Sequence, residues 1–431
     1  MTSIKVYPSK KISGTTNLPG DKSISHRAIL LSSVAYGTSV IKGCSLCDDC
    51  FASINAIKTL GIGLEQNSEN ELIIHGKGMY GYLEPEKKIY CNRSGTTIRL
   101  LAGLLAGQRF SCELSGDPQL LKRPMTRMSN PLKDMGADIQ TNDGHGPIQI
   151  HGSVLNGYKH QLSIASAQVK SAILLAGLYA KSRTSIHQPG SSRDHTEKML
   201  QSMGAELDIS NASITIKPVT SLKPIEISVP GDISSAVFPI AAGLLTDKSE
   251  VICKDVGINH TRTGLIDVLT KMGAEIKFIN KRSNGNEPVA DIIARSSSLK
   301  GVEVSGEIVV RMIDEFPIFA VLATQASGKT IVRNAKELRV KETDRIKTVA
   351  TELQKLGASI NTYEDGFEIN GPVRLNSSGI ADSHGDHRLA MALVIAGHIA
   401  DKPLVINNVD CISDSYPNFI QSMQSLGAHY D

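Results

Sequence analysis

The chain has 431 residues, of which 41% are hydrophobic, and a formal net charge of +3. This length allows two domains of roughly 200 residues, each with its own hydrophobic core. The charge is too small for a protein that binds nucleic acid along a basic surface, and tryptophan is absent. No apolar run approaches the ~18 residues of a membrane span, and residues 1–11 lack the apolar core of a signal peptide. We therefore expect a cytoplasmic protein without a membrane segment or a nucleic-acid partner.

The first informative feature in chain order is a loop that leads into a helix at residues 19–33. Asp21 is a typical N-cap residue, and Lys22 and Arg27 place cations near the first turn. Free backbone N–H groups and the helix dipole favour an anion there, although an ordinary capped helix with solvated charges is the alternative. The Pro-Gly-Asp sequence returns at residues 230–232, which indicates a duplication.

A short phrase, an apolar residue followed by glycine, recurs six times along the chain. Each copy follows an amphipathic pattern and most precede a short strand-like run, which predicts a helix that ends at the glycine. A helix rich in Ala, Leu and Ile and a β-branched strand are expected upstream in each repeat. The pattern predicts six α/β units in two sets of three. The glycines are Gly61, Gly136, Gly204, Gly273, Gly357 and Gly427.

The two Pro-Gly turns that mark the duplication suggest where the chain crosses between domains. We expect an N-terminal domain at residues 20–232 and a C-terminal domain at residues 233–431, which residues 1–19 join. The strands that we expect include residues 39–41, 184–187, 206–209, 275–279 and 330–333.

Small polar or charged residues precede the first helix of each unit. If the units pack around pseudo-threefold axes, these helix N-termini converge toward the cleft between the domains, where their dipoles favour anions. The starts are Asp21-Lys22-Ser23, Ser94-Gly95-Thr96-Thr97, Ser166-Ala167-Gln168, Asp232-Ile233-Ser234-Ser235, Asp314-Glu315 and Gly385-Asp386-His387-Arg388.

Nine runs, in order and over essentially the whole chain, resemble the EPSP synthases (3-phosphoshikimate 1-carboxyvinyltransferases). They are LPGDKSISHRA, SGTTIRLLAG, GDPQLLKRPM, SAQVKSAILLAGL, SRDHTEKML, PGDISSA, IDEFP, ELRVKETDRI and GDHRLAM. Two of them, SAQVKSA and SRDHTEKML, are more similar to the class II bacterial forms. The resemblance implies an α/β chain with the two-domain enolpyruvyl transferase fold, an inside-out α/β barrel of six βαβαββ-type repeats, three per domain. We expect a monomer.

The reaction that this resemblance implies moves the carboxyvinyl group of phosphoenolpyruvate to the 5-hydroxyl of shikimate 3-phosphate. It passes through a tetrahedral intermediate, releases phosphate, and belongs to the shikimate pathway of chorismate and aromatic amino-acid biosynthesis. No metal or organic cofactor is required. The two small-molecule substrates bring phosphates and carboxylates, which arginine pairs with bidentately.

The resemblance also assigns residues to each substrate. Shikimate 3-phosphate would be held by Lys22, Ser23, Arg27, Ser166, Ala167, Gln168, Arg193, Asp314 and Lys341. Phosphoenolpyruvate would be held by Lys22, Gly95, Arg123, Gln168, Arg345 and Arg388.

The catalytic residues implied by the resemblance are Asp314, Glu342 and Lys22. Asp314 is expected to begin a helix after an apolar strand at residues 308–310, and to orient or deprotonate the 5-hydroxyl. Glu342 would exchange protons with the methylene carbon. The alternative for either acid is a surface ion pair, which is common on helices.

The sequence departs from the family pattern before Ser94, where family members usually read Gly-Asn and this chain has Asn92-Arg93. Arg93 either contacts the phosphate of phosphoenolpyruvate or points to solvent. The second outcome is favoured, because Arg123, Arg345 and Arg388 already supply cations.

Two other functions stay open. A sister enolpyruvyl transferase that acts on UDP-N-acetylglucosamine would need a cysteine in the loop before Arg123, and residues 115–122 contain none. A non-catalytic relative that binds a phospho-ligand is suggested only by Asn92-Arg93. Because binding alone does not need two acids, Asp314 and Glu342 argue against it.

Two motifs imitate other sites. Residues 326–330 resemble the end of a P-loop, but the lysine precedes a strand rather than a helix, so we expect a turn. Cys44, Cys47 and Cys50 have iron–sulfur-like spacing without a fourth cysteine, so we expect no metal there.

Overall fold

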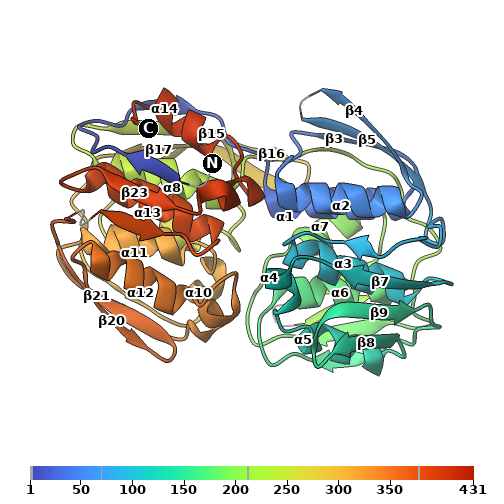
Figure 1. Ribbon diagram of the computed structural model, residues 1–431. Helices are drawn as coiled ribbons and strands as arrows, with labels where there is room; N and C mark the ends of the chain where they lie inside the picture. The colour runs from blue at the N-terminus through green and yellow to red at the C-terminus, as the bar shows by residue number, and fades with distance from the viewer. Residues whose placement is uncertain (1–2, 69, 211–212, 377–378) are drawn as a thin grey trace. The chain divides into compact units, whose positions relative to one another are not determined.

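The computed structural model describes residues 3–68, 70–210, 213–376 and 379–431 (Figure 1). The chain forms two compact units, which are described separately. Unit 1 contains the described residues of Met1–Pro19, Pro230–Ser283 and Glu287–Asp431, and unit 2 contains those of Gly20–Val229 and Asn284–Asn286. The chain crosses between the units after Pro19 and again after Val229. The expected N-terminal domain ran to residue 232, whereas residues 230–232 fold with unit 1.

Unit 2 consists of three repeats, each with two main helices and a four-stranded sheet. The first repeat contains α1 (Lys22–Val34), β3 (Tyr36–Lys42), α2 (Asp48–Thr59), β4 (Gly63–Ser68), β5 (Glu71–Lys77) and the distant strand β14 (Glu226–Ser228). The second contains β6 (Ile89–Tyr90), α3 (Gly95–Ala106), β7 (Ser111–Ser115), α4 (Pro118–Leu121), α5 (Thr126–Asp134), β8 (Asp138–Asn142) and β9 (His145–His151). The third contains β10 (Lys159–Gln161), α6 (Ala167–Gly177), β11 (Thr184–His187), α7 (His195–Ser202), β12 (Leu207–Ile209) and β13 (Ser213–Ile216).

Unit 1 repeats this plan, except that the sheet of its last repeat has three described strands. Its first repeat contains β2 (Gly14–Thr16), α8 (Ile233–Leu245), β15 (Glu250–Gly257), α9 (Gly264–Lys271), β16 (Glu275–Asn284) and β17 (Glu287–Arg295). The next contains β18 (Glu303–Val304), α10 (Glu307–Arg311), α11 (Phe316–Thr324), β19 (Gly328–Val332), η1 (Lys336–Val340), α12 (Arg345–Lys355), β20 (Ser359–Tyr363) and β21 (Gly366–Gly371). The last contains β22 (Ile380–Asp382), α13 (His387–Ile399), β23 (Leu404–Asn407), η2 (Val409–Asp414), α14 (Phe419–Ser425) and β1 (Ser3–Val6).

The four-stranded sheets of both units share one strand order. In the sheet β6-β7-β9-β8, for example, β6 pairs parallel with β7, and β9 pairs antiparallel with both β7 and β8. The last sheet of unit 1 uses a strand from the start of the chain, because β1 pairs antiparallel with β23. Lys5 N then donates to the carbonyl of Asp431 at 2.9 Å, so both ends of the chain meet at this sheet.

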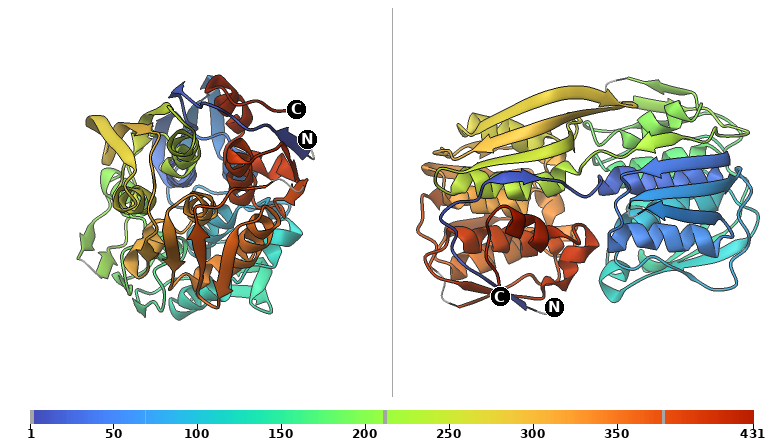
Figure 2. Two further views of the ribbon diagram at one scale, coloured as in Figure 1. Left: turned by 90° about the vertical axis from the view of Figure 1, so that its left-hand side faces the viewer. Right: turned by 90° about the horizontal axis from the view of Figure 1, so that it is seen from above.

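Each unit has its own hydrophobic core, built around one apolar helix from each repeat. These helices are α1, α3 and α6 in unit 2 and α8, α11 and α13 in unit 1. Most residues of each helix are buried, including polar ones such as Ser25 and Ser32 of α1, so each of these helices is covered on nearly every side. The left view of Figure 2 shows the helices of unit 1 nearly end-on, with strands around them. Among the described residues, no helix is both long and apolar enough to cross a membrane.

The recurring glycine phrase ends six helices in the same way. The glycines have φ angles between 80° at Gly61 and 102° at Gly427, in the left-handed region that glycine adopts without a Cβ clash. In each case two hydrogen bonds close the helix, as in Gly61 N to Lys58 O at 2.9 Å and Ile62 N to Ile57 O at 3.0 Å. This is the Schellman motif, so a local signal in the sequence defines the end of each amphipathic helix.

Two details of the predicted elements differ from the structure. Residues 308–310 lie in the short helix α10 and not in a strand. Asp314 lies in the turn before α11, whose N-cap is Glu315, and therefore does not begin the helix. A three-residue apolar run cannot distinguish a strand from a buried helical turn, which is why the sequence was misleading here.

Candidate active site

The N-termini of the three core helices in unit 2 are close to one another and are capped by side chains. Asp21, Ser94 and Ser166 each accept a hydrogen bond from a backbone N–H of the first turn, in α1, α3 and α6 respectively. Side chains join these helix starts: Ser53 Oγ of α2 lies 2.8 Å from both His26 Nδ1 and Thr97 Oγ1, and Gln168 Nε2 of α6 donates to Thr96 Oγ1 at 3.1 Å. The expected convergence of helix N-termini is therefore present within this unit.

Lys22 is the first residue of α1, and its ammonium pairs with a carboxylate of the next helix. Lys22 Nζ lies 2.8 Å from Asp49 Oδ2, and the two side chains keep 16% and 12% of their exposure. The pair is thus largely shielded from water but open at one side. Asp49 orients the ammonium and compensates part of its charge, a role that the sequence reasoning missed.

Arg27 lies in the first half of α1 and is buried. Its Nε donates to Thr196 Oγ1 at 2.6 Å, Nη2 donates to Ser171 Oγ at 2.8 Å, and Nη1 donates to the Ser23 carbonyl at 2.9 Å. These bonds tie α1 to α6 and α7 and hold the backbone of Ser23. Arg27 therefore supports the first turn of α1.

His26 is also buried at this helix start. Burial lowers the pKa of its imidazole well below the ordinary value of 6.5, and the charges of Lys22 and Arg27 lower that pKa further. The ring is therefore neutral at physiological pH and adds no charge beside Lys22.

Arg193 lies in the segment before α7 and approaches the start of α1. Its Nη1 donates to Ser23 Oγ at 3.3 Å, and the residue is half-buried. Ser23 and Arg193, two of the residues assigned to shikimate 3-phosphate, are thus neighbours although 170 positions separate them.

Gly95 opens α3 beneath two guanidinium groups. A Cβ at this position would lie 2.8 Å from both Arg123 Nη1 and Arg99 Nη1, so the absence of a side chain lets both arginines approach the helix start. Arg99 Nη1 also donates to Gln168 Oε1 at 2.7 Å. Arg99, which the sequence reasoning did not single out, therefore orients Gln168 and borders the same position as Arg123.

Arg93 is exposed and paired with an acid of its own unit. Its Nε lies 3.2 Å from Asp117 Oδ2, and 41% of its side chain is exposed. Asn92 has a φ of 47°, a left-handed conformation that glycine and asparagine adopt most readily. Asn92 therefore makes a left-handed turn at this position without a glycine.

The core helices of unit 1 have a similar arrangement. Asp232 caps α8 and Asp386 caps α13, and each accepts from backbone N–H groups of its own first turn. Ser234 Oγ donates to Glu315, the N-cap residue of α11, and Arg262 Nη2 donates to Asp232 Oδ1 at 2.9 Å. The starts of α8 and α11 are therefore joined through buried polar side chains.

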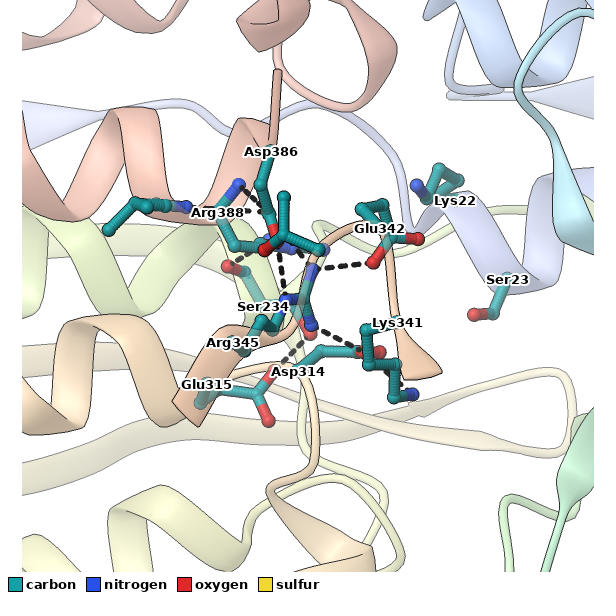
Figure 3. Close-up of polar contacts among 12 residues, drawn as sticks. Lys22, Ser23, Ser234, Asp314, Glu315, Lys341, Glu342, Arg345, Asp386 and Arg388 are labelled. Atoms are coloured by element: carbon teal, nitrogen blue, oxygen red, sulfur yellow. Dashed lines mark hydrogen bonds and ion pairs between the residues drawn. The ribbon is translucent and has the colours of Figure 1, made fainter. Parts of the chain in front are cut away.

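Arg345 lies at the centre of an acidic group in unit 1 (Figure 3). Its guanidinium contacts Glu342 Oε2 at 2.8 Å and Asp314 Oδ1 at 3.4 Å, in addition to Asp386. The Arg345 side chain is 1% exposed, whereas those of Glu342 and Asp314 are 25% and 21% exposed. Burial alone lowers the pKa of Arg345, but the three carboxylates outweigh it and raise that pKa above its ordinary value.

The remaining cations of unit 1 flank this group. Lys341 Nζ lies 3.4 Å from Asp314 Oδ1, and both side chains are 21% exposed. Arg388 Nη1 donates to the Ser234 carbonyl at 2.6 Å, and Arg388 is buried. The structure thus brings together all five residues predicted in this unit, namely Asp314, Lys341, Glu342, Arg345 and Arg388. Asp386 was named only as a helix start, and its N-cap signal was the clue to its role.

The P-loop-like sequence and the three closely spaced cysteines lie in ordinary local structure. Lys329 lies in the strand β19 and not at a helix start. Cys44, Cys47 and Cys50 are buried with free thiols, and Cys50 lies in α2.

The whole chain matches one protein family. A family model described as EPSP synthase (3-phosphoshikimate 1-carboxyvinyltransferase) matches residues 6–423. The chain belongs to the EPSP synthase family. A relative named 3-phosphoshikimate 1-carboxyvinyltransferase from Thermodesulfovibrio yellowstonii is 48% identical over 98% of this chain and 99% of its own length. A relative of the same name from Bacillus subtilis is 45% identical over 96% of this chain and 97% of its own length.

Solved structures agree with the family. An EPSP synthase from Acinetobacter baumannii has a TM-score of 0.88 and 38% identity, and each chain covers 100% of the other. The enolpyruvyl transferase NikO from Streptomyces tendae has a TM-score of 0.82 at 17% identity, over 100% of this chain and 98% of its own, which shows the fold alone. The expected enolpyruvyl transferase fold is confirmed, and the family match favours the EPSP synthases over the sister family.

Proposed function

We propose that the protein transfers the carboxyvinyl group of phosphoenolpyruvate to the 5-hydroxyl of shikimate 3-phosphate, giving 5-enolpyruvylshikimate 3-phosphate and phosphate. Membership of the EPSP synthase family over nearly the whole chain supports this reaction. The observation that carries it in the structure is the contact of Arg345 with both Asp314 and Glu342. A buried cation that holds two partly exposed acids suits a reaction with two proton transfers.

The acids have separate tasks in this proposal. Asp314 orients or deprotonates the 5-hydroxyl as its oxygen attacks C2 of phosphoenolpyruvate, and Glu342 gives a proton to C3. In the elimination step Glu342 takes a proton from C3 while the C2–O bond to phosphate breaks. Lys341 and Arg345 compensate the charge of both carboxylates at 2.8–3.4 Å.

Anion binding is assigned to the helix starts and the nearby cations. Lys22, Ser23 and Arg193 meet shikimate 3-phosphate, and Ser166, Ala167 and Gln168 add the first turn of α6. Gly95 leaves room for Arg123 at the phosphoenolpyruvate position, and Arg345 and Arg388 supply further charge. Arg27, whose Nη1 donates to the Ser23 carbonyl, is also assigned to shikimate 3-phosphate. Charge-assisted bonds of this kind are about twice as strong as neutral ones.

The proposal also covers the oligomeric state, the location and the pathway of the protein. The substrates are small molecules, and the protein acts as a monomer in the cytoplasm as part of the shikimate pathway.

A phosphate-release assay tests the function. Purified protein is mixed with shikimate 3-phosphate and phosphoenolpyruvate, together and singly, with and without EDTA. Phosphate is expected only when both substrates are present, and EDTA should not change its rate. Release with UDP-N-acetylglucosamine as acceptor and none with shikimate 3-phosphate would overturn the proposal. Loss of activity with EDTA that a divalent metal restores would refute the cofactor-free reaction.

A further inference from the structure

A fully buried ion pair joins α6 and α7 in unit 2, and neither residue belongs to the substrate-binding set. Lys170 Nζ lies 2.6 Å from Glu197 Oε1, and the side chains are 1% and 3% exposed. Lys170 lies in the first half of α6, and Glu197 lies in the first turn of α7. A charge at such a depth is costly unless it is paired and hydrogen-bonded.

The Lys170 ammonium has three donors, and the structure gives each of them an acceptor. Besides Glu197, Nζ donates to the carbonyl of Arg193 at 2.8 Å and to that of Ser192 at 3.3 Å. The two carbonyls belong to consecutive residues, so besides Glu197 the ammonium binds the backbone of residues 192–193.

Residues 191–194 contain Arg193, whose guanidinium contacts Ser23. Residues 191–194 have no regular secondary structure, and α7 begins immediately after them. The segment is therefore not fixed by a helix or a sheet. Lys170 holds its carbonyls from one side, and Ser192 Oγ donates to Gln188 Oε1 at 2.9 Å. The position of the Arg193 guanidinium, 3.3 Å from Ser23 Oγ, depends on where these contacts hold its backbone.

Packing alone does not explain the pair. Buried ion pairs can often be replaced by apolar side chains of similar volume without loss of stability. An apolar side chain at position 170 would fill the space but could not donate to the two carbonyls. What the lysine supplies, and an apolar side chain cannot, is the pair of hydrogen bonds to the Ser192 and Arg193 carbonyls.

We propose that Lys170 is a positioning residue that fixes the Arg193 backbone so that its guanidinium meets shikimate 3-phosphate, with Glu197 compensating the charge of Lys170. The inference rests on the proposed function, because it needs Arg193 as a ligand of that substrate. It predicts an effect mainly on shikimate 3-phosphate, since Arg193 is assigned to that substrate and none of the residues assigned to phosphoenolpyruvate lies in residues 191–194.

The first test replaces the pair by apolar residues. Lys170→Met/Glu197→Leu leaves no isolated buried charge and should melt within a few degrees of the wild type, whereas Lys170→Met alone strands Glu197 and is expected to be less stable. The double variant should raise the KM and Kd for shikimate 3-phosphate by about ten- to a hundredfold, as expected for a misplaced ligand. The KM for phosphoenolpyruvate should stay within about twofold. Binding of shikimate 3-phosphate as tight as in the wild type would overturn the proposal.

The second test asks whether Lys170 acts through Arg193. If it does, Lys170→Met/Glu197→Leu should add almost nothing to the loss already caused by Arg193→Ala, because residues that act as a unit are non-additive. Losses that multiply would show that Lys170 acts elsewhere and would refute the assignment.

A matched control separates positioning from general damage. Gln108 is buried just beyond the C-terminal end of α3, and its amide donates to the Met79 carbonyl at 2.9 Å. Gln108→Leu removes a buried carbonyl contact far along the helix from Gly95 and should lower stability without a substrate-specific change. An equal, selective loss of shikimate 3-phosphate binding in this control would contradict the proposal. Absence of phosphate release in the wild type would instead refute the proposed function itself.

Discussion

Arg345 binds Asp386 through two hydrogen bonds in unit 1, from Nε to Oδ2 at 2.8 Å and from Nη2 to Oδ1 at 3.1 Å. Asp386 Oδ1 also accepts from the backbone N–H of Arg388 at 2.9 Å, so one carboxylate both caps α13 and fixes the guanidinium (Figure 3). The guanidinium then presents its remaining donors to Glu342 and Asp314. The start of a core helix therefore sets the geometry of the two acids.

Neutralising Asp386 should destabilise the protein strongly. Asp386→Asn keeps an N-cap side chain but leaves the buried Arg345 without its main counter-charge, and breaking such a pair costs about 3–5 kcal/mol. Urea unfolding followed by circular dichroism measures the change. Glu364→Gln, which removes an exposed acid paired with Lys336, is the control and should leave the unfolding curve almost unchanged. Equal midpoints for the two variants would contradict the role of Asp386.

Removing either proposed proton-transfer acid should lower turnover far more than it lowers stability. Glu342→Ala and Asp314→Ala are expected to reduce kcat by about 10²-fold or more. Both side chains are partly exposed, so the fold should persist. Steady-state phosphate release and melting curves are the measurements, with Glu364→Ala as an exposed acid in the same unit. Near-normal turnover in both variants would show that the acids are misassigned.

Arg93 should have little influence on phosphoenolpyruvate. Its exposed side chain pairs with Asp117, and exposed pairs of this kind contribute little. Arg93→Ala and Arg93→Asn should each change the KM for phosphoenolpyruvate by less than about threefold. Steady-state kinetics with each substrate varied in turn measure the two KM values in each variant. A rise of tenfold or more, confined to phosphoenolpyruvate in both variants, would make Arg93 a substrate ligand.

His398 should make unit 1 less stable in acid. Burial lowers the pKa of its imidazole from 6.5 to about 4, although the Tyr7 carbonyl opposes the shift. The unfolded chain therefore binds a proton at a higher pH than the folded chain. The contribution of this neutral histidine is complete above pH 6.5 and is lost as the pH falls toward 4.

The loss amounts to about 1.4 kcal/mol per pH unit within this window. Unfolding free energies measured between pH 7 and 4.5 should therefore fall less steeply in His398→Gln than in the wild type. The variant should also be less stable at pH 7, because Nε2 of His398 lies 2.7 Å from the Tyr430 hydroxyl. Identical slopes in the two proteins would contradict the assignment.

Local chemistry made much of the fold predictable from sequence. Gly61 and its five counterparts end helices through contacts within six consecutive residues, so the phrase that contains them reports the structure directly. N-cap residues such as Asp21 and Ser94 accept a hydrogen bond from the backbone N–H three positions later, so the starts of these helices can also be predicted from the sequence. The repeats, the core helices and the family resemblance were therefore all open to sequence reasoning.

The environment of each candidate site residue was decided by the tertiary structure. Arg27 is buried because Ser171 and Thr196 reach it from helices more than a hundred positions away, and nothing near Arg27 in the sequence signals this. The hold of Lys170 on the Arg193 carbonyl is likewise invisible in the motif that contains Lys170. Sequence determines which charged groups are present and how each helix begins and ends. Their partners depend on packing between distant segments, because burial and pairing of a charge are set by whatever the fold brings within about 4 Å.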